Sequence, residues 1–244
     1  MAPTSMEKLH DEIVSVARGH SMAVWGVADL TLLSQKKPDI LSEVGRGAGS
    51  PDAFTRAIVM GVRLQHAVVE GLADGPTLLY FHLYRQANYQ LDRAAFELAD
   101  VVQKAGYAAA AIPASQVIGR NPMRGHLSHK LLGWAAGIGW IGRSSLLVHP
   151  EYGAGVRYVS VLTDAPLAAG TPHGGSCGEC RRCAALCPAH AIHDSFRDFD
   201  LDACYEKLCE FSRMPGIGQH ICGLCVKACM GIQGSEFRVG KPKC

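Results

Sequence analysis

The sequence predicts two domains of different chemistry, an α/β domain over residues 1–170 and a cysteine-rich domain over residues 171–244. Helical and strand-like apolar segments alternate over about the first 165 residues, a pattern typical of layered α/β folds. All ten cysteines, by contrast, lie between Cys177 and Cys244. Residues 165–175 are rich in proline, glycine and alanine, which is typical of a linker between domains.

Apolar periodicity predicts the elements of the first domain in order. Thr4 and Glu7 have the spacing of a capping box and begin a helix that continues to residue 19. Two further helices are expected, over residues 86–104 and over residues 126–136. A polar loop occupies residues 34–51. Strands are expected over residues 22–27, 56–62, 107–112, 144–148 and 156–162.

The composition is that of an ordinary globular chain, with 48% hydrophobic and 19% charged residues. The first residues lack the basic segment and apolar run of a signal peptide. The longest weakly polar stretch, residues 131–142, is too short to span a bilayer. We therefore expect a cytoplasmic protein with no membrane partner, in which thiols stay reduced and metal binding is favoured over disulfides.

The strongest motif is the run Cys-x2-Cys-x2-Cys-x3-Cys-Pro over residues 177–188, the run of bacterial ferredoxins. Its first three thiolates bind one cube, whereas its fourth ligates another cube, so a second set of ligands is required. Cys-x2-Cys-x3-Cys over residues 222–229 supplies that set, together with Cys204 or Cys209. Zinc and disulfides are the alternatives, but tetrahedral zinc does not need this third cysteine or the Cys-Pro. The motif predicts two [4Fe–4S] clusters.

The charge of the chain carries no sign of a nucleic-acid partner. The formal net charge is +2 and the isoelectric point is about 8.0. Each oxidised cluster with four thiolates adds about −2, which brings the loaded protein to about −2. A nucleic-acid partner is therefore not expected.

Glycines at positions 137, 139 and 142 match the dinucleotide-binding fingerprint by letter. That fingerprint needs a strand before it and a helix after it, whereas here the predicted helix comes first and the strand follows. The pattern alone leaves two interpretations open, a dinucleotide site and a purely structural helix-to-strand turn.

Residues 126–153, followed by Thr163-Asp-Ala-Pro-Leu167 and the cysteine run, resemble two related families. These are the epoxyqueuosine reductases and the respiratory reductive dehalogenases, which carry an (A)GLGxxG(K/R)xxLL…PEYG segment ahead of a double-cluster domain. The resemblance is specific over residues 126–190 and only architectural over residues 1–125. It implies a nitroreductase-like, layered α/β/α domain that binds cobalamin (a corrinoid), followed by a ferredoxin-like domain with both clusters.

The resemblance also implies the positions of the sites. The corrin would be lined by Gly137, Gly139, Trp140, Gly142, Arg143, Tyr152 and Gly153. The sequence around Cys204 (Leu201-Asp-Ala-Cys204) is similar to the context of the displaced ligand in epoxyqueuosine reductases, which favours Cys204 and leaves Cys209 and Cys244 without a role. One cluster is then expected on Cys177, Cys180, Cys183 and Cys229. The other is expected on Cys187, Cys204, Cys222 and Cys225.

The chain departs from both families around the expected proton donor. Epoxyqueuosine reductases place a catalytic aspartate ahead of the glycine turn, whereas residues 114–125 contain no carboxylate here. We also expect the tRNA-binding repeats of that family, and the export signal of the dehalogenases, to be absent. Candidates by residue type alone are Tyr84, Tyr89 and Arg120, and the catalytic acid is unassigned.

Two irregular segments, residues 34–51 and 114–125, are the predicted lids over a substrate, with Arg120 or Arg124 as an anchor for an anionic group. His126 and His129, three apart on a predicted helix, suit either proton transfer or a structural role, and the structural role is the commoner one.

The function expected from these features is that of an iron–sulfur oxidoreductase. Electrons from a low-potential donor such as ferredoxin or flavodoxin would pass through two [4Fe–4S] clusters to a corrinoid, which would reduce a small-molecule substrate. One alternative is an electron-transfer protein that reduces a corrinoid protein and has no substrate of its own. Another is a double-cluster enzyme with flavin in place of the corrinoid.

Overall fold

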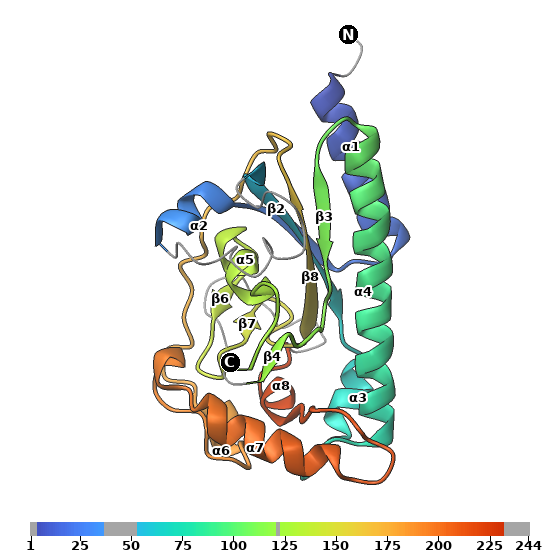
Figure 1. The fold of residues 1–244 in the computed structure, drawn as a ribbon. Coiled ribbons are helices and arrows are strands. Elements are labelled where there is room, and N and C mark those ends of the chain that lie inside the picture. Colours follow the sequence, from blue (N-terminus) through green and yellow to red (C-terminus); the bar gives the residue numbers. More distant parts are fainter. Residues whose placement is uncertain (1–3, 37–52, 121–122, 232–244) are drawn as a thin grey trace. The chain divides into compact units, whose positions relative to one another are not determined.

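The computed structural model describes residues 4–36, 53–120 and 123–231 (Figure 1). The chain divides into two compact units, each assembled from separate stretches of sequence. Unit 1 comprises Met1–Val62, Asn88–Ile138 and Arg157–His173, and unit 2 comprises Arg63–Ala87, Gly139–Val156 and Gly174–Cys244. Two segments that precede residue 170 therefore fold with the cysteines. The boundary expected near that residue stays a prediction.

A four-stranded sheet forms the centre of unit 1, in the order β1-β2-β8-β3 (Figure 1). Strand β1 (Val24–Asp29) pairs antiparallel with β2 (Arg56–Arg63), and β3 (Ala109–Ile112) pairs antiparallel with β8 (Val156–Thr163). The long strands β2 and β8 are buried almost throughout, as expected for apolar runs. All four lie within two residues of their predicted positions.

Helix α1 (Ser5–Gly19) confirms the capping box. The Thr4 hydroxyl accepts the N–H of Glu7 at 3.2 Å, and the Thr4 N–H donates to the Glu7 carboxylate at 2.7 Å. Helix α2 (Leu30–Lys36) follows β1 and occupies the start of the predicted polar loop. The rest of that loop, a predicted lid, lies outside the described residues.

Helix α4 (Leu78–Lys104) begins eight residues earlier than predicted. The hydroxyl of Thr77 accepts the N–H of Tyr80 at 3.1 Å and so starts the helix ahead of its periodic part. The predicted apolar face is confirmed, since Leu91, Leu98 and Val102 are fully buried.

Helix α5 (His129–Ala135) is capped at its N-terminus by Ser128, whose hydroxyl accepts the N–H of Leu131. It is followed by Gly137, with φ +78°, and by β6 (Trp140–Ile141), which pairs with β7 (Leu147–Val148). The predicted order of helix, turn and strand is confirmed. It is the reverse of the order that a dinucleotide fingerprint requires.

Residues 165–175 form neither helix nor strand, and the stretch is partly exposed but anchored at several points. Ala165 is fully buried, and the N–H of Gly170 donates to the carbonyl of Val27 at 2.8 Å. A side chain at Gly170 would overlap the carbonyl oxygen of Ala136. These contacts attach the predicted linker to unit 1.

Unit 2 contains short helices around the cysteines. Helices α6 (Arg182–Ala185) and α8 (Leu224–Ala228) pack against each other, and α3 (His66–Glu70) packs against α8. In the described part of the chain, no helix combines the length and the apolar character that a membrane span requires. The bounds of the remaining elements are η2 Phe196–Asp198, α7 Leu201–Ser212, β4 Gly119–Arg120 and β5 Met123–Arg124.

Candidate iron–sulfur site

None of the nine cysteines among the described residues is joined in a disulfide. Cys244 lies outside those residues. Sulfur donors that are half-buried or buried, and not joined in disulfides, are the ligand type that iron–sulfur clusters use. The grouping of these thiols in unit 2 determines how many clusters they can bind.

The first group lies on the loop that leads into α6. The N–H of Cys180 donates to the carbonyl of Cys177 at 3.1 Å, and Gly178 adopts φ +51° to close this turn. Burial raises the pKa of the Cys183 thiol, and the charges of Cys177 and Cys180 raise it further. The three sulfurs are therefore close neighbours.

The second group is centred on Cys225. Burial strongly raises the pKa of its thiol, and the charges of its neighbours Cys222, Cys204, Cys183 and Cys187 raise it further. Burial and the charge of Cys187 also raise the pKa of Cys222. Thiols with raised pKa values stay neutral at physiological pH unless a metal takes the place of their protons. Within the described part of the chain, no group of three or more His, Cys, Asp or Glu side chains is arranged so that it could hold a metal ion, so these thiols as cluster ligands stay a prediction.

Cys229 lies with the first group rather than the second. It packs with Trp140, Val148 and Ala154, and Cys177 lies against the same cluster of side chains. The carbonyl of Cys229 accepts the N–H of Ala154 at 2.7 Å. Cys229 and Cys177 thus pack against the same cluster of side chains, and the assignment of Cys229 to the first iron–sulfur cluster stays a prediction.

Helix α7 carries both Cys204 and Cys209, five positions apart. Five positions correspond to about 500° of rotation, so the two side chains leave the helix in different directions. Cys204 is one of the charges that act on Cys225. This arrangement favours Cys204 as the ligand.

The glycines of the turn ahead of the cysteines are needed by the chain itself. A Cβ at Gly137 would lie 2.7 Å from the carbonyl oxygen of Thr171, and one at Gly139 would overlap the carbonyl of Val148. At Gly142, a Cβ would lie 2.7 Å from a methyl carbon of Val148 and 3.3 Å from the sulfur of Cys177. These glycines, which the resemblance places along the corrin, lie in close contact with other segments of the protein.

The other residues predicted to line a corrin also contact protein. Trp140 is buried beside Cys229, and the guanidinium of Arg143 is bonded to backbone carbonyls. The ring of Tyr152 stacks on His149 at a centroid distance of 4.8 Å, and Gly153 pairs with His149 and Met230. Each of these seven residues thus makes contacts within the protein, and their expected role in lining a corrin stays a prediction.

His129 has a structural role. Its Nε2 lies 2.9 Å from the carbonyl oxygen of Pro113, and its Nδ1 lies 2.9 Å from the hydroxyl of Ser160. Since a carbonyl can only accept, Nε2 carries the proton and Nδ1 accepts from the serine. Burial lowers the pKa of His129, which keeps the ring neutral. His126 contacts the side chain of Gln116 at 3.2 Å.

A carboxylate next to the predicted lid was not predicted from the sequence. Asp92, on α4, accepts the N–H of Ala114 at 2.8 Å. One turn earlier, Asn88 accepts the Nε–H of Arg157 at 2.6 Å. The spacing of four between these two polar residues was the available signal. Tyr84 and Tyr89 also lie on α4, where Tyr89 is exposed, and Arg120 ends β4.

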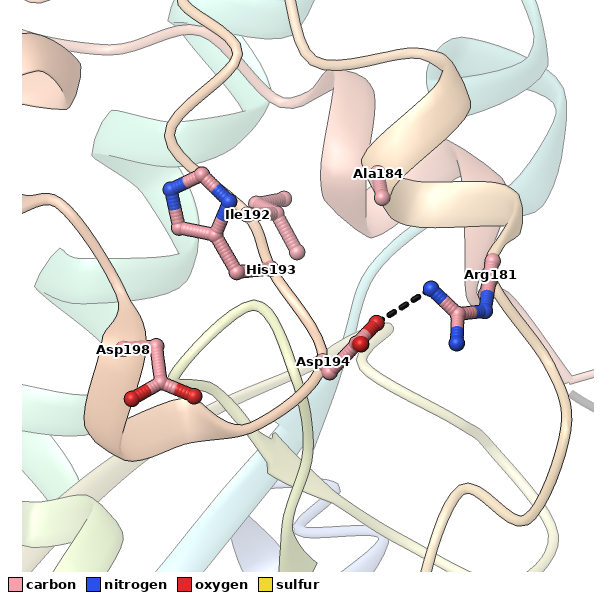
Figure 2. Close-up of a pocket in the computed structure, with 6 residues that line it drawn as sticks. All are labelled: Arg181, Ala184, Ile192, His193, Asp194 and Asp198. Carbon is pink, nitrogen blue, oxygen red and sulfur yellow. Dashed lines mark hydrogen bonds and ion pairs between the residues drawn. The ribbon is translucent and has the colours of Figure 1, made fainter.

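A surface hollow of about 340 Å³ lies beside the second cysteine group (Figure 2). Its apolar wall, Ala184 and Ile192, packs against Cys183, Cys187 and Cys225. Figure 2 shows an ion pair between Arg181 and Asp194 at its rim. The lining residues are Arg181, Ala184, Ile192, His193, Asp194 and Asp198.

No protein-family model matches the chain. Over 65 residues it is 46% identical to the epoxyqueuosine reductase of Synechococcus sp. (strain CC9605), a match that covers 26% of this chain and 20% of that protein. Over 68 residues it is 41% identical to the epoxyqueuosine reductase of Gloeobacter violaceus, covering 28% and 21%. The chain thus matches about a fifth of the length of these relatives.

Two solved structures share the fold. A catabolic reductive dehalogenase in complex with 3-bromo-4-hydroxybenzoic acid superposes with a TM-score of 0.68 at 20% identity, over 89% of this chain and 31% of that one. The epoxyqueuosine reductase of Streptococcus thermophilus superposes with a TM-score of 0.56 at 17% identity, over 96% of this chain and 67% of that one.

The fold is that of a mixed helix and sheet protein, and the nine cysteines of the described chain all lie within residues 177–229. The chain is similar in sequence to epoxyqueuosine reductases over 65 to 68 residues and shares its fold with a reductive dehalogenase, the two families that the glycine turn and the cysteine run suggested.

Proposed function

We propose that this protein is a cytoplasmic iron–sulfur oxidoreductase with two [4Fe–4S] clusters. One cluster is held by Cys177, Cys180, Cys183 and Cys229, and the other by Cys187, Cys204, Cys222 and Cys225. The support for the proposal is the ferredoxin-type spacing of the cysteines, together with the charge interactions that link Cys183 to Cys177 and Cys180, and Cys225 to Cys222, Cys204 and Cys187. In this reading the sheet and its helices are a layered, nitroreductase-like domain, and the cysteine segment is ferredoxin-like.

Each cluster, when bound, takes up and releases one electron at a time. The protein's own part is to hold the thiolates, exclude water and adjust the reduction potential. Trp140 and Val148 shield the first set, and Ile192 shields the second. The N–H of Ala191 donates to the sulfur of Cys187 at 3.4 Å, and such bonds stabilise the reduced, more negative cluster.

The surface hollow is the entry point that we propose for a low-potential donor such as ferredoxin or flavodoxin. Its apolar wall is shared with the second cysteine set, so a partner seated there would approach the cluster through a single layer of side chains. The proposed electron path then runs from the second set to the first set, because Cys183 and Cys225 belong to different sets and are neighbours.

A corrinoid is the electron acceptor that we propose, with a small molecule reduced in turn. The support lies in the relatives, among them a reductive dehalogenase whose structure was described in terms of B12-dependent dehalogenation. A second candidate is an electron carrier that serves a corrinoid-containing partner. The observation that favours it is that all seven residues expected to line the corrin contact other parts of the protein.

Anaerobic reconstitution followed by titration with hydroxocobalamin tests this proposal. We expect about eight iron atoms per chain, a broad cluster absorption, and a base-off cobalamin spectrum that saturates near one equivalent. Clusters without corrinoid binding would select the carrier. Tight binding of flavin, with no affinity for cobalamin, would contradict both and select the flavin alternative.

We also expect no reduction of epoxyqueuosine in tRNA. The expected catalytic aspartate has no counterpart in residues 114–125, and the nearby carboxylate of Asp92 already accepts a backbone N–H. The assay is conversion of epoxyqueuosine-containing tRNA by the reconstituted protein with a chemical reductant. Turnover would contradict the prediction. If Asp92→Asn then abolished it, Asp92 would be the missing proton donor.

A further inference from the structure

The guanidinium group of Arg143 donates hydrogen bonds to three backbone carbonyls of unit 2. Its Nε donates to the carbonyl of Cys180 at 2.9 Å and its Nη2 to that of Gly178 at 2.5 Å. Its Nη1 donates to the carbonyl of Asp194. A planar fork of fixed geometry suits this task, because each donor reaches a different acceptor without rotation of the others.

The backbone that carries Arg143 is itself tightly held. The N–H of Gly142 donates to the carbonyl of Leu146 at 2.8 Å, and the N–H of Ser145 donates to the carbonyl of Gly142 at 2.9 Å. A Cβ at Gly142 would lie 3.3 Å from the sulfur of Cys177, so the turn touches the first ligand directly. The side chain of Arg143 therefore starts from a rigid turn and ends on the cluster loop.

The third acceptor connects this loop to the hollow. Asp194 accepts Arg143 with its carbonyl and pairs with Arg181 through its carboxylate, as Figure 2 shows for the latter. Asp194 also lines the hollow. One arginine thus joins the glycine turn, the loop of Cys177 and Cys180, and one wall of the hollow.

We infer that Arg143 is a positioning residue for the first cluster. It holds the loop in the conformation that presents three thiolates, and its positive charge stabilises the reduced cluster, which carries one more negative charge. This inference rests on the proposed pair of clusters. It gives the arginine of the glycine-turn motif a role at the iron–sulfur site in place of the corrin contact that the resemblance implied.

Two substitutions separate the roles of geometry and charge. Arg143→Lys keeps the charge but not the three-way fork, whereas Arg143→Gln removes both. Arg213→Gln is the matched control, because it removes the same charge from an exposed position of unit 2. The readouts are the rate of iron loss to a chelator and the midpoint potential of each cluster, followed by electron paramagnetic resonance during redox titration.

We expect both Arg143 variants to lose iron from one cluster about 10-fold faster than the unmodified protein, the lower end of the effect of removing an outer-shell partner. Only Arg143→Gln should also move the midpoint potential of that cluster to a more negative value. The other cluster should keep its iron and its midpoint potential, and Arg213→Gln should match the unmodified protein in both measurements. Circular dichroism verifies that the variants are folded.

Unchanged iron retention and unchanged potentials in both Arg143 variants would overturn the inference while leaving the two clusters in place. Equal shifts of both clusters in the lysine and glutamine variants would also overturn it, because they would indicate a general loosening of the fold. Failure of the unmodified protein to bind clusters would instead overturn the proposed function itself.

Discussion

Cys225→Ala is expected to lower the iron content from about eight to about four atoms per chain, the loss of one complete [4Fe–4S] cluster. The reason is its place at the centre of the second set, buried and next to Cys222, Cys204 and Cys187. Without that thiolate, the remaining three cannot close the coordination of the cube. Iron analysis and the cluster absorption after anaerobic reconstitution measure the effect.

Two other cysteines serve as matched controls, because we assign neither of them to a cluster. Cys209→Ala and Cys244→Ala should both keep about eight iron atoms per chain. Cys204→Ala should behave like Cys225→Ala. If Cys209→Ala lost half of the iron and Cys204→Ala did not, our assignment of the ligand on α7 would be wrong.

Local signals explain what could be predicted of the fold. The capping box at Thr4 and Glu7, and the apolar runs of β2 and β8, depend on interactions within a few residues or on burial of a whole segment. Such signals are legible in one sequence. The early start of α4 was missed because Thr77 caps the helix outside its apolar period.

At the candidate site, contacts between residues distant in sequence could not be predicted. Motif spacing predicted which cysteines are ligands, since the ferredoxin run encodes its own geometry. The same spacing could not show what the glycines contact, because their partners, Thr171, Val148 and Cys229, are non-local. The contact of Asp92 with residue 114 was missed for the same reason, as α4 and the predicted lid are separate in sequence.

Gly153 is the glycine at which a single methyl group should have the largest effect. Its backbone has φ +59°, and a Cβ there would overlap the carbonyl oxygen of Cys229 and lie 2.8 Å from the carbonyl carbon. Main-chain bonds prevent either segment from moving away, since Gly153 and His149 exchange two of them, at 2.8 and 2.9 Å, and the N–H of Ala154 donates to the Cys229 carbonyl.

Gly153→Ala therefore combines a left-handed conformation that disfavours alanine with a collision between backbones, a cost of about 3 kcal/mol or more. Because the displaced residue is Cys229, the variant should lose the cluster of the first set and retain that of the second. Iron content near four atoms per chain, with a lower unfolding temperature, is the expected result.

Gly174→Ala is the control for the added methyl group, since no atom of the described chain lies within 4 Å of its Cβ position and its φ is not in the left-handed region. It should keep both clusters and the unfolding temperature of the unmodified protein. The opposite result for Gly153→Ala, both clusters intact and only cobalamin binding lost, would return this glycine to the role that the resemblance implied. The comparison of these two variants thus decides whether residues 150–153 (Pro-Glu-Tyr-Gly) support the iron–sulfur site or line a corrin.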